Sequence, residues 1–221
     1  MKSPLTSEVL FHIGPLPIAW QVVATWIVMA ALTGVAIVGT RRLRVEQPGR
    51  LQVLLEAGIE LIQAQIRDTM RCEPRAFLPL IATLFLFIAV ANLSSLVPGM
   101  EPPTASIETD AALALIVLGS VIVTGLRSHG LLGYLKTFAT PSWVMVPLNL
   151  VEQLTRTFSL MVRLFGNIMS GVFIIGILLS LAGLFVPIPF MALDVLTGLI
   201  QAYIFTVLTM VFIGAAVHEG D

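Results

Sequence analysis

The C-terminal third of the chain decides its fold. Residues 145–217 read MVPLNLVEQLTRTFSLMVRLFGNIMSGVFIIGILLSLAGLFVPIPFMALDVLTGLIQAYIFTVLTMVFIGAAV. A turn that contains prolines divides this run into two apolar segments, residues 145–184 and 190–217, and a membrane-spanning helix needs about 20 such residues. Both segments therefore predict spanning helices, joined as a hairpin. Because both are longer than the bilayer requires, we expect them to be tilted.

The composition of the whole chain also indicates a membrane protein. Of its 221 residues, 57% are apolar and 11% are charged, and the mean hydropathy is +0.97; soluble domains carry about 25% charged residues. A net charge of −1 offers no basic surface for nucleic acid. The single cysteine, Cys72, excludes an internal disulfide framework and a cysteine-based zinc site. We expect one all-α integral membrane domain over residues 1–221, with no metal ion and no cofactor.

Three further apolar segments precede the hairpin. They cover residues 18–40, 77–98 and 111–126. The first is followed at once by Arg41 and Arg42, whereas a secretory signal peptide carries its positive charge before its apolar segment. This first segment is therefore expected to remain in the mature chain. The total is about five transmembrane helices.

The charges between the spans predict the orientation of the chain. Residues 41–75 are rich in arginine, whereas residues 99–110 contain acidic residues and no basic one. Basic loops stay on the cytoplasmic side of a membrane. The N-terminus is therefore expected outside and the C-terminus in the cytoplasm.

Residues 50–67 have a different pattern, with apolar side chains on one helical face and charged or amide side chains on the other. The apolar face comprises Leu51, Leu54, Leu55, Leu61, Ile62 and Ile66. This pattern predicts an amphipathic helix that lies on the cytoplasmic membrane face or against a partner. Packing on the inner loops of the same chain is an equally good interpretation.

Four ionisable residues lie in the C-terminal hairpin, where a charge at the bilayer centre costs at least about 2.5 kcal/mol. Glu152 and Arg156 are four residues apart, so they can neutralise each other on one helix face. Arg163 and Asp194 have no opposite charge within one helical turn. Each of these two side chains needs a partner or water, and each is a candidate functional residue.

Arg163 belongs to a polar stripe on its helix. Thr155, Ser159, Arg163 and Asn167 are spaced by four, so they fall on one face at about 100° per residue. A guanidinium stays protonated at any accessible pH, so Arg163 must face water, a carboxylate or both. One interpretation is an ion pair with Asp194 of the same chain. The other is a cation that faces a separate partner.

Asp194 shares a helix face with Gln201, because a separation of seven positions completes nearly two turns. A carboxyl group at membrane depth can bind and release a proton, which suits Asp194 to an ion relay. For Gln201 a structural role competes with a transport role, since an amide can simply hydrogen-bond between two helices.

At these residues the sequence resembles the a subunit of F-type ATP synthases. MVRLFGNIMSG at residues 161–171 is the most specific motif, and LIQAYIFTVLT follows at residues 199–209. Three weaker motifs occur in the family's order: FLPLIATLFLFIAVANLSSLVPG, DAALALIVLGS and HGLLGYLKTF. The resemblance extends from about residue 18 to residue 217.

The resemblance implies a role for each matching residue. Arg163 matches the family's essential arginine, which faces the ring of c subunits and interacts with their ion-carrying carboxylate. Ser159 and Asn167 match polar positions beside it, and Gln201 matches the glutamine packed close to that arginine. Asn92 matches an asparagine at the outer end of the second span.

Two positions depart from the family's pattern. Val172 stands where many members have a glutamate, and Asp194 stands where they often have a histidine or glutamate. Asp194 is therefore expected to be the titratable group of the outer access path. The expected lining of the outer half-channel is Asp194, Gln201 and either Glu108 or Asp110. The expected lining of the inner half-channel is Ser159, Glu152 and Asn167.

The resemblance also implies the function and the partners. The chain would be the stator subunit a in the bilayer of the cell inner (plasma) membrane, working with the c-subunit ring, b-type peripheral stalk subunits and the rest of the complex. The sequence has no P-loop, HExxH or GxSxG motif, so ATP chemistry would belong to other subunits. Two alternatives remain: a divergent F-type ATPase subunit a that pumps H⁺ or Na⁺, and a stand-alone secondary transporter, whose repeated halves are absent here.

Overall fold

The computed structural model describes residues 9–13, 16–41, 49–96, 102–139, 145–183 and 185–218. Its longer elements, in chain order, are β1 (Val9–Ile13), β2 (Leu16–Ala19), α1 (Trp20–Thr40), α2 (Arg50–Met70), α3 (Leu78–Leu93), α4 (Ile107–Ala139), α5 (Met145–Ala182) and α6 (Pro187–His218). Three short 3₁₀ helices join them: η1 (Pro74–Ala76), η2 (Ser94–Leu96) and η3 (Pro103–Ala105).

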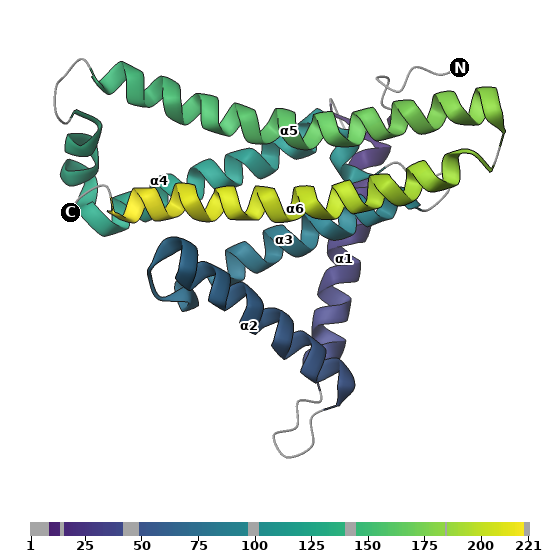
Figure 1. Cartoon of the computed structure of the whole chain (residues 1–221). Coiled ribbons are helices and arrows are strands. Elements are labelled where there is room, and N and C mark those ends of the chain that lie inside the picture. The colour runs from purple at the N-terminus through teal and green to yellow at the C-terminus, as the bar shows by residue number, and fades with distance from the viewer. Residues whose placement is uncertain are drawn as a thin grey trace.

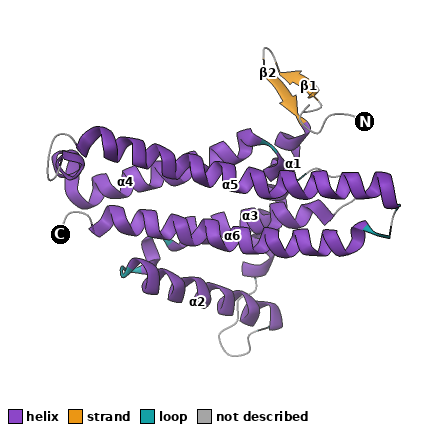
Figure 2. Ribbon diagram, turned by 45° about the horizontal axis from the view of Figure 1, so that its top comes forward, coloured by secondary structure: helices purple, strands orange, loops and turns teal. Residues whose placement is uncertain are grey.

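The prediction of an all-α membrane protein is confirmed for the body of the molecule. Five of the described helices, α1, α3, α4, α5 and α6, are long and apolar enough to cross a membrane. The sequence did not indicate the antiparallel hairpin of β1 and β2 that precedes α1 (Figure 2). Ile18 pairs with Phe11 in this hairpin, so α1 begins at Trp20 and not at the predicted residue 18.

Several predicted boundaries shift for local reasons. The third span is much longer than residues 111–126, because α4 already begins at Ile107, where Glu108 and Asp110 complement the positive end of the helix dipole. Gly130, with φ 70° and ψ 171°, then kinks α4. The second span is shorter than residues 77–98, since α3 gives way to η2 after Leu93. Helix α6 begins at Pro187 and not at residue 190, because proline is well accommodated in a first helical turn.

Helices α5 and α6 lie side by side and run at a steep angle to α1 (Figure 1). The apolar segment of α5, Val146–Leu181, has 36 residues. At 1.5 Å per residue it is about 54 Å long, against about 30 Å of hydrocarbon. It fits within the bilayer only if its axis lies closer to the membrane plane than to the normal. The length of the hairpin thus supports the predicted tilt.

Helix α6 lies at the centre of the packing and α5 at its edge. α6 contacts α2, α3, α4 and α5. In an 18-residue apolar stretch of α6 half of the residues are buried, compared with 11% in such a stretch of α5. Phe205 of α6 is fully buried in the core, together with Leu164 of α5 and Ile88 of α3. One side of α5 is therefore left without a partner from the described part of the chain.

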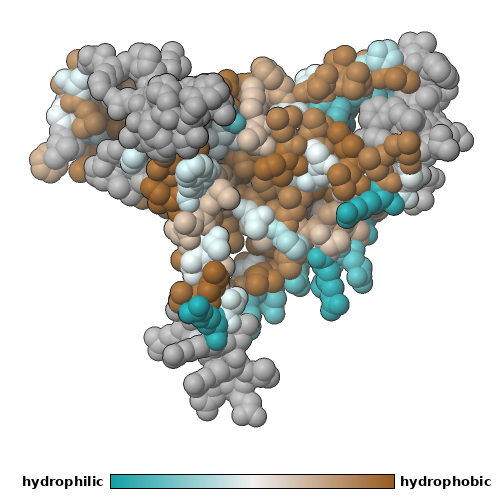
Figure 3. All heavy atoms as spheres, turned by 180° about the vertical axis from the view of Figure 1, so that it is seen from behind, coloured by the Kyte–Doolittle hydropathy of each residue, from teal (hydrophilic) through white to brown (hydrophobic). Residues whose placement is uncertain are grey.

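Helix α2 is attached to the bundle by its C-terminal end. Ile66 and Met70 are buried in the core, where α2 packs against α3 and α6. Leu61, predicted on the same apolar face, is 72% exposed. Polar side chains gather along α2 at the lower right of Figure 3. The end of this amphipathic helix therefore packs on its own chain, and its middle leaves apolar side chains uncovered by the described residues.

We predict that Phe205→Ala destabilises the fold. Phe205 has no exposed surface, and removing a buried phenylalanine ring costs about 3–5 kcal/mol. The measurement is thermal unfolding of the detergent-solubilised protein. Val211→Ala on the same helix is the control, because its exposed side chain contributes little to the core; equal melting temperatures for the two variants would contradict this description of the core.

Candidate functional site

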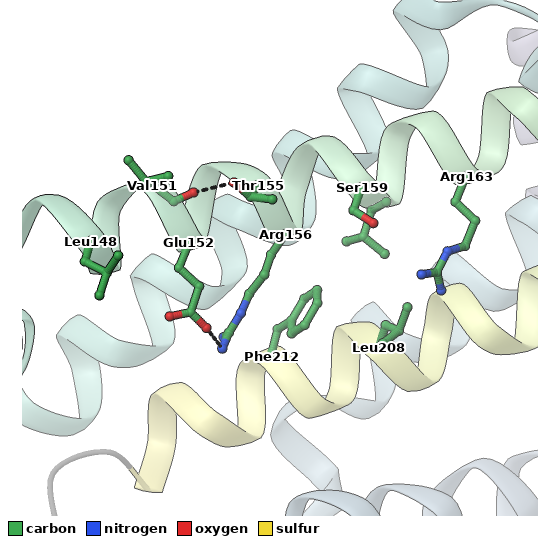
Figure 4. Close-up of a pocket in the computed structure, with 10 residues that line it drawn as sticks. Leu148, Val151, Glu152, Thr155, Arg156, Ser159, Arg163, Leu208 and Phe212 are labelled. Atoms are coloured by element: carbon green, nitrogen blue, oxygen red, sulfur yellow. Dashed lines mark hydrogen bonds and ion pairs between the residues drawn. The ribbon is translucent and has the colours of Figure 1, made fainter.

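A groove of about 530 Å³ follows α5 on the side that faces α6 (Figure 4). Its walls are formed by Leu148, Val151, Glu152, Thr155, Arg156, Ser159, Leu160, Arg163, Leu208 and Phe212. All but two of these residues come from one face of α5, as the spacing by four predicts. Three residues of the polar stripe found in the sequence, Thr155, Ser159 and Arg163, therefore line the groove, and the fourth, Asn167, does not.

At one end of the groove a cation is already neutralised. Arg156 donates a hydrogen bond to Glu152 and forms an ion pair with it. The Arg156 guanidinium also lies over the ring of Phe212, 5.3 Å from the ring centroid. Arg156 is thus held by two interactions within the chain, and Glu152 is engaged with it.

Arg163 lies at the other end of the groove and is exposed (Figure 4). Among the described residues, none forms an ion pair or hydrogen bond with its guanidinium. The first interpretation of Arg163, an ion pair with Asp194, is therefore not what the structure shows. The exposed Ser159 precedes it by one turn in the same groove, and Arg163 remains a cation whose counter-charge must come from elsewhere.

Asp194 lies instead against Gly171, where α6 meets α5. A Cβ atom built on Gly171 would lie 2.7 Å from Cγ of Asp194, so the carboxyl group occupies the space that a larger residue would need. The Ser95 hydroxyl lies near this carboxyl group and donates a hydrogen bond to the carbonyl oxygen of Asn92 at 2.8 Å. Gly171 is eight residues beyond Arg163, about 12 Å along the helix axis, and this offset explains the missing ion pair.

Asn92 joins three elements at the same end of the molecule. Its amide donates a hydrogen bond to the carbonyl oxygen of Gly198 in α6 at 2.7 Å, and its Oδ1 accepts one from the Thr104 hydroxyl in η3 at 3.0 Å. Both Asn92 and Thr104 are buried. The sequence pointed to Asn92 but not to Thr104, because a threonine between two prolines and an alanine carries no periodic signal. Gly198 must be small here, since an added Cβ would lie 2.9 Å from Cβ of Asn92.

Two amide side chains in this region are buried without a partner. Neither Nδ2 of Asn167 nor Nε2 of Gln201 has a hydrogen-bond acceptor, and both atoms are shielded from solvent. An unsatisfied buried donor costs about 1–3 kcal/mol, so such groups usually have water nearby. The structural interpretation of Gln201, an interhelical hydrogen bond from its amide nitrogen, has no acceptor among the described residues.

The predicted site residues thus form two groups, and two residues, Asn167 and Glu108, lie outside both. Asn167 follows Arg163 by one turn on α5 but does not line the groove. Glu152 and Ser159 share the groove with Arg163, whereas Asn92, Asp194 and Gln201 belong to the packed interior around α6. Glu108 belongs to neither group, because its side chain is exposed at the start of α4. Among the residues that the structure describes, no cluster of His, Cys, Asp or Glu is arranged to hold a metal ion.

The chain is similar to known proteins over nearly its whole length. The family model described as "ATP synthase A chain" matches residues 22–214. "ATP synthase subunit a 2" of Bradyrhizobium sp. (strain BTAi1) is 60% identical over 216 residues, covering 98% of this chain and 96% of that protein. "ATP synthase subunit a 1" of Chlorobaculum parvum is 47% identical over 214 residues, covering 96% of this chain and 95% of that protein.

We predict that Gly171→Ala disturbs the contact between α5 and α6. Overpacking at a filled position costs about 1–3 kcal/mol, and Asp194 already occupies the space. Thermal unfolding of the solubilised protein measures the loss. Gly166→Ala is the matched control on the same helix, because nothing lies within 4 Å of its added Cβ and alanine is the better helix former. The loss should be smaller in a Gly171→Ala/Asp194→Ala double variant; an unchanged loss would show that the contact with Asp194 is not its cause.

Proposed function

This chain belongs to the ATP synthase A chain family, and we propose that it is the stator subunit whose Arg163 faces a moving ion-carrying carboxylate in the membrane. It is subunit a of the membrane sector of an F-type ATP synthase, a multi-pass membrane protein that works within that complex. In the proposed mechanism the chain provides two half-channels and an essential arginine.

The observation that carries the proposal is an exposed arginine on an exposed helix. Only 11% of the residues in an 18-residue apolar stretch of α5 are buried, and the Arg163 guanidinium has no counter-charge among the described residues. A permanent cation at membrane depth requires water or a carboxylate. A ring of c subunits packed along the free side of α5 would supply the carboxylate.

The same charge explains how an ion would be coupled to rotation. A rotor carboxylate can pass through lipid only when a proton or an ion neutralises it, because a bare charge is too costly there. As it approaches Arg163, attraction to the guanidinium favours release of the bound ion. A fixed cation at this point also repels free cations, so an ion cannot leak directly past it. The ion must instead travel with the rotor from one half-channel to the other.

The geometry supports an assignment of the two half-channels. Glu152 and Ser159 share the groove that ends at Arg163, and we assign them, with Asn167, to the inner half-channel. Asp194 and Gln201 lie on α6, and Asn92 is bonded to Gly198 between them. We assign these three residues to the outer half-channel. Glu108 would stand at its mouth, since its side chain is exposed.

The orientation and the partners follow from the same proposal. The arginine-rich segment 41–75 places α2 on the cytoplasmic side and the N-terminus outside the inner (plasma) membrane. α2 leaves apolar side chains uncovered, where the bilayer surface or b-type stalk subunits would pack. The coupling ion is H⁺ or Na⁺, and ATP chemistry takes place on other subunits.

We predict that Arg163→Ala abolishes ATP synthesis driven by an ion gradient, because the rotor carboxylate loses the cation that discharges it. Assembly should be retained, since the guanidinium makes no bond within the described chain. The measurement is ATP synthesis in vesicles, with co-purification of the c-type subunit as the test of assembly. Arg127→Ala, which removes an exposed cation of α4 away from the groove, is the control. Wild-type coupling in Arg163→Ala would exclude the proposal.

We also predict that Asp194→Asn slows ion flux by about tenfold or more, as expected when a proton-transfer group is lost. Gln201→Ala should have a smaller effect, because an amide can orient water but cannot carry the ion. Passive and ATP-driven flux in vesicles measure both variants. Small and equal effects would indicate that the outer path does not pass Asp194.

A further inference from the structure

A second carboxyl group, which the proposed mechanism does not yet use, is buried at the start of α4. The side chain of Asp110 is 0% exposed, and neither of its carboxylate oxygens accepts a hydrogen bond from a described residue. Glu108, two residues earlier in the same turn, is exposed. Of the two acidic residues that the sequence offered for the outer path, the structure thus encloses Asp110 and leaves Glu108 at the surface.

Asp110 lies on the buried face of α4, one turn before the apolar residues of that face. Ala114, Val117 and Val121 follow at helical spacing and are buried in the core. The elements packed against α4 are α5, α6 and η3. Their described charges are Glu152, Arg156, Arg163 and Asp194, and none of them bonds to Asp110. A buried carboxylate without any cation is too costly to persist, so a proton, an ion or water must complete it.

Two observations elsewhere in the interior point to water rather than to a dry core. Nδ2 of Asn167 and Nε2 of Gln201 are buried donors without acceptors, on the two helices that pack against α4. Unsatisfied donors and unsatisfied acceptors thus occur on elements in mutual contact. Internal water is the usual way to satisfy such groups.

We propose that Asp110 is a binding group for the coupling cation, H⁺ or Na⁺, on a hydrated path inside the bundle between the outer surface and Asp194. The inference rests on the proposed function. It adds Asp110 to Asp194 as a second titratable group in the outer half-channel. The cation reaches Asp110 from the start of α4, neutralises the enclosed carboxylate, and moves on through water held by the amide of Gln201. Glu108 attracts cations at the entrance but does not bind them in transit.

The competing explanation is structural. A carboxylate in the first turn of a helix stabilises the helix dipole, and Asp110 meets that description. An asparagine in its place would keep the shape and lose only the charge. Ion transport therefore separates the two explanations, because the dipole role affects stability and not flux.

The first test compares Asp110→Asn with Glu60→Gln in vesicles that contain the whole complex. Glu60 is an exposed carboxylate of α2, outside the proposed ion path. ATP synthesis is driven once by a proton gradient and once by a Na⁺ gradient, and the gradient that drives the wild-type protein identifies the cation. Asp110→Asn should lower synthesis by about tenfold or more, as for loss of a proton-transfer group. Glu60→Gln should stay within about twofold of wild type, as for most surface substitutions. If Asp110→Asn also stayed within about twofold of wild type in assembled complexes, the proposal would be overturned.

The second test asks whether water reaches position 110, and it does not depend on activity. In a Cys72→Ser background, Asp110→Cys places a unique thiol in this chain, and Val117→Cys places one two turns deeper on the same stripe. The assembled complex is treated with methyl methanethiosulfonate, and mass spectrometry measures the modified fraction. The cysteine at 110 should react readily and the one at 117 slowly. Equal, slow reaction at both positions would mean a dry interior and would sink the inference.

The two proposals can fail separately. If Arg163→Ala abolishes coupling while Asp110→Asn behaves as wild type, the stator function stands and Asp110 is structural. If Asp110→Asn blocks flux while Arg163→Ala still couples, Asp110 belongs to an ion path and the rotor mechanism is wrong.

Discussion

A guanidinium that cannot lose its proton must be kept out of hydrocarbon, and in this chain no described carboxylate does so for Arg163. Two acidic residues on the same helix pair have other contacts. Glu152 forms an ion pair with Arg156, and the carboxyl group of Asp194 lies against Gly171. The guanidinium of Arg163 is therefore left exposed and without a counter-charge from the described residues. The remaining features of the fold can be understood as the means of holding that charge at a fixed place.

Rigidity around Arg163 comes from α6. This helix contacts four other helices, and half of the residues in an 18-residue apolar stretch of it are buried. Two close approaches fix its position: Asn92 bonds to the Gly198 carbonyl from α3, and Asp194 fits against Gly171 of α5. Both need a glycine, because an added Cβ would overlap the facing side chain. α5 is thus held on one side by α4 and α6, while its other side remains open for a second protein.

Much of this fold could be predicted because hydrophobicity in a bilayer is a one-dimensional signal. A run of about 20 apolar residues has few ways to fold, so the five spans and the long hairpin followed from the sequence. Helical periodicity likewise placed Ser159 and Arg163 on one face, and the structure puts both in one groove. The family resemblance directed attention to Asn92 and Gln201, whose surroundings no periodicity argument could supply.

What the sequence did not predict depends on contacts between segments. Whether Arg163 meets Asp194 depends on the axial offset of α5 against α6, which neither helix encodes alone. The exposure of Leu61 could not be foreseen either, because amphipathicity says which face is apolar but not how much of it another helix will cover. The same holds for Thr104, which becomes a buried bridge only when η3 reaches Asn92.

The offset that separates Arg163 from Asp194 has a physical consequence for coupling. If the two side chains formed an ion pair, the charge of Arg163 would be neutralised and could not attract a rotor carboxylate. Asp194 would then stay ionised and could not bind and release a proton. Placed about 12 Å apart along α5, by way of Gly171, they act on different partners. The cation faces the groove between α5 and α6, and the carboxyl group lies against Gly171. Under the proposed function, a stator that releases an ion at one place and accepts it at another would need such a separation, and the contact between Asp194 and Gly171 would set it.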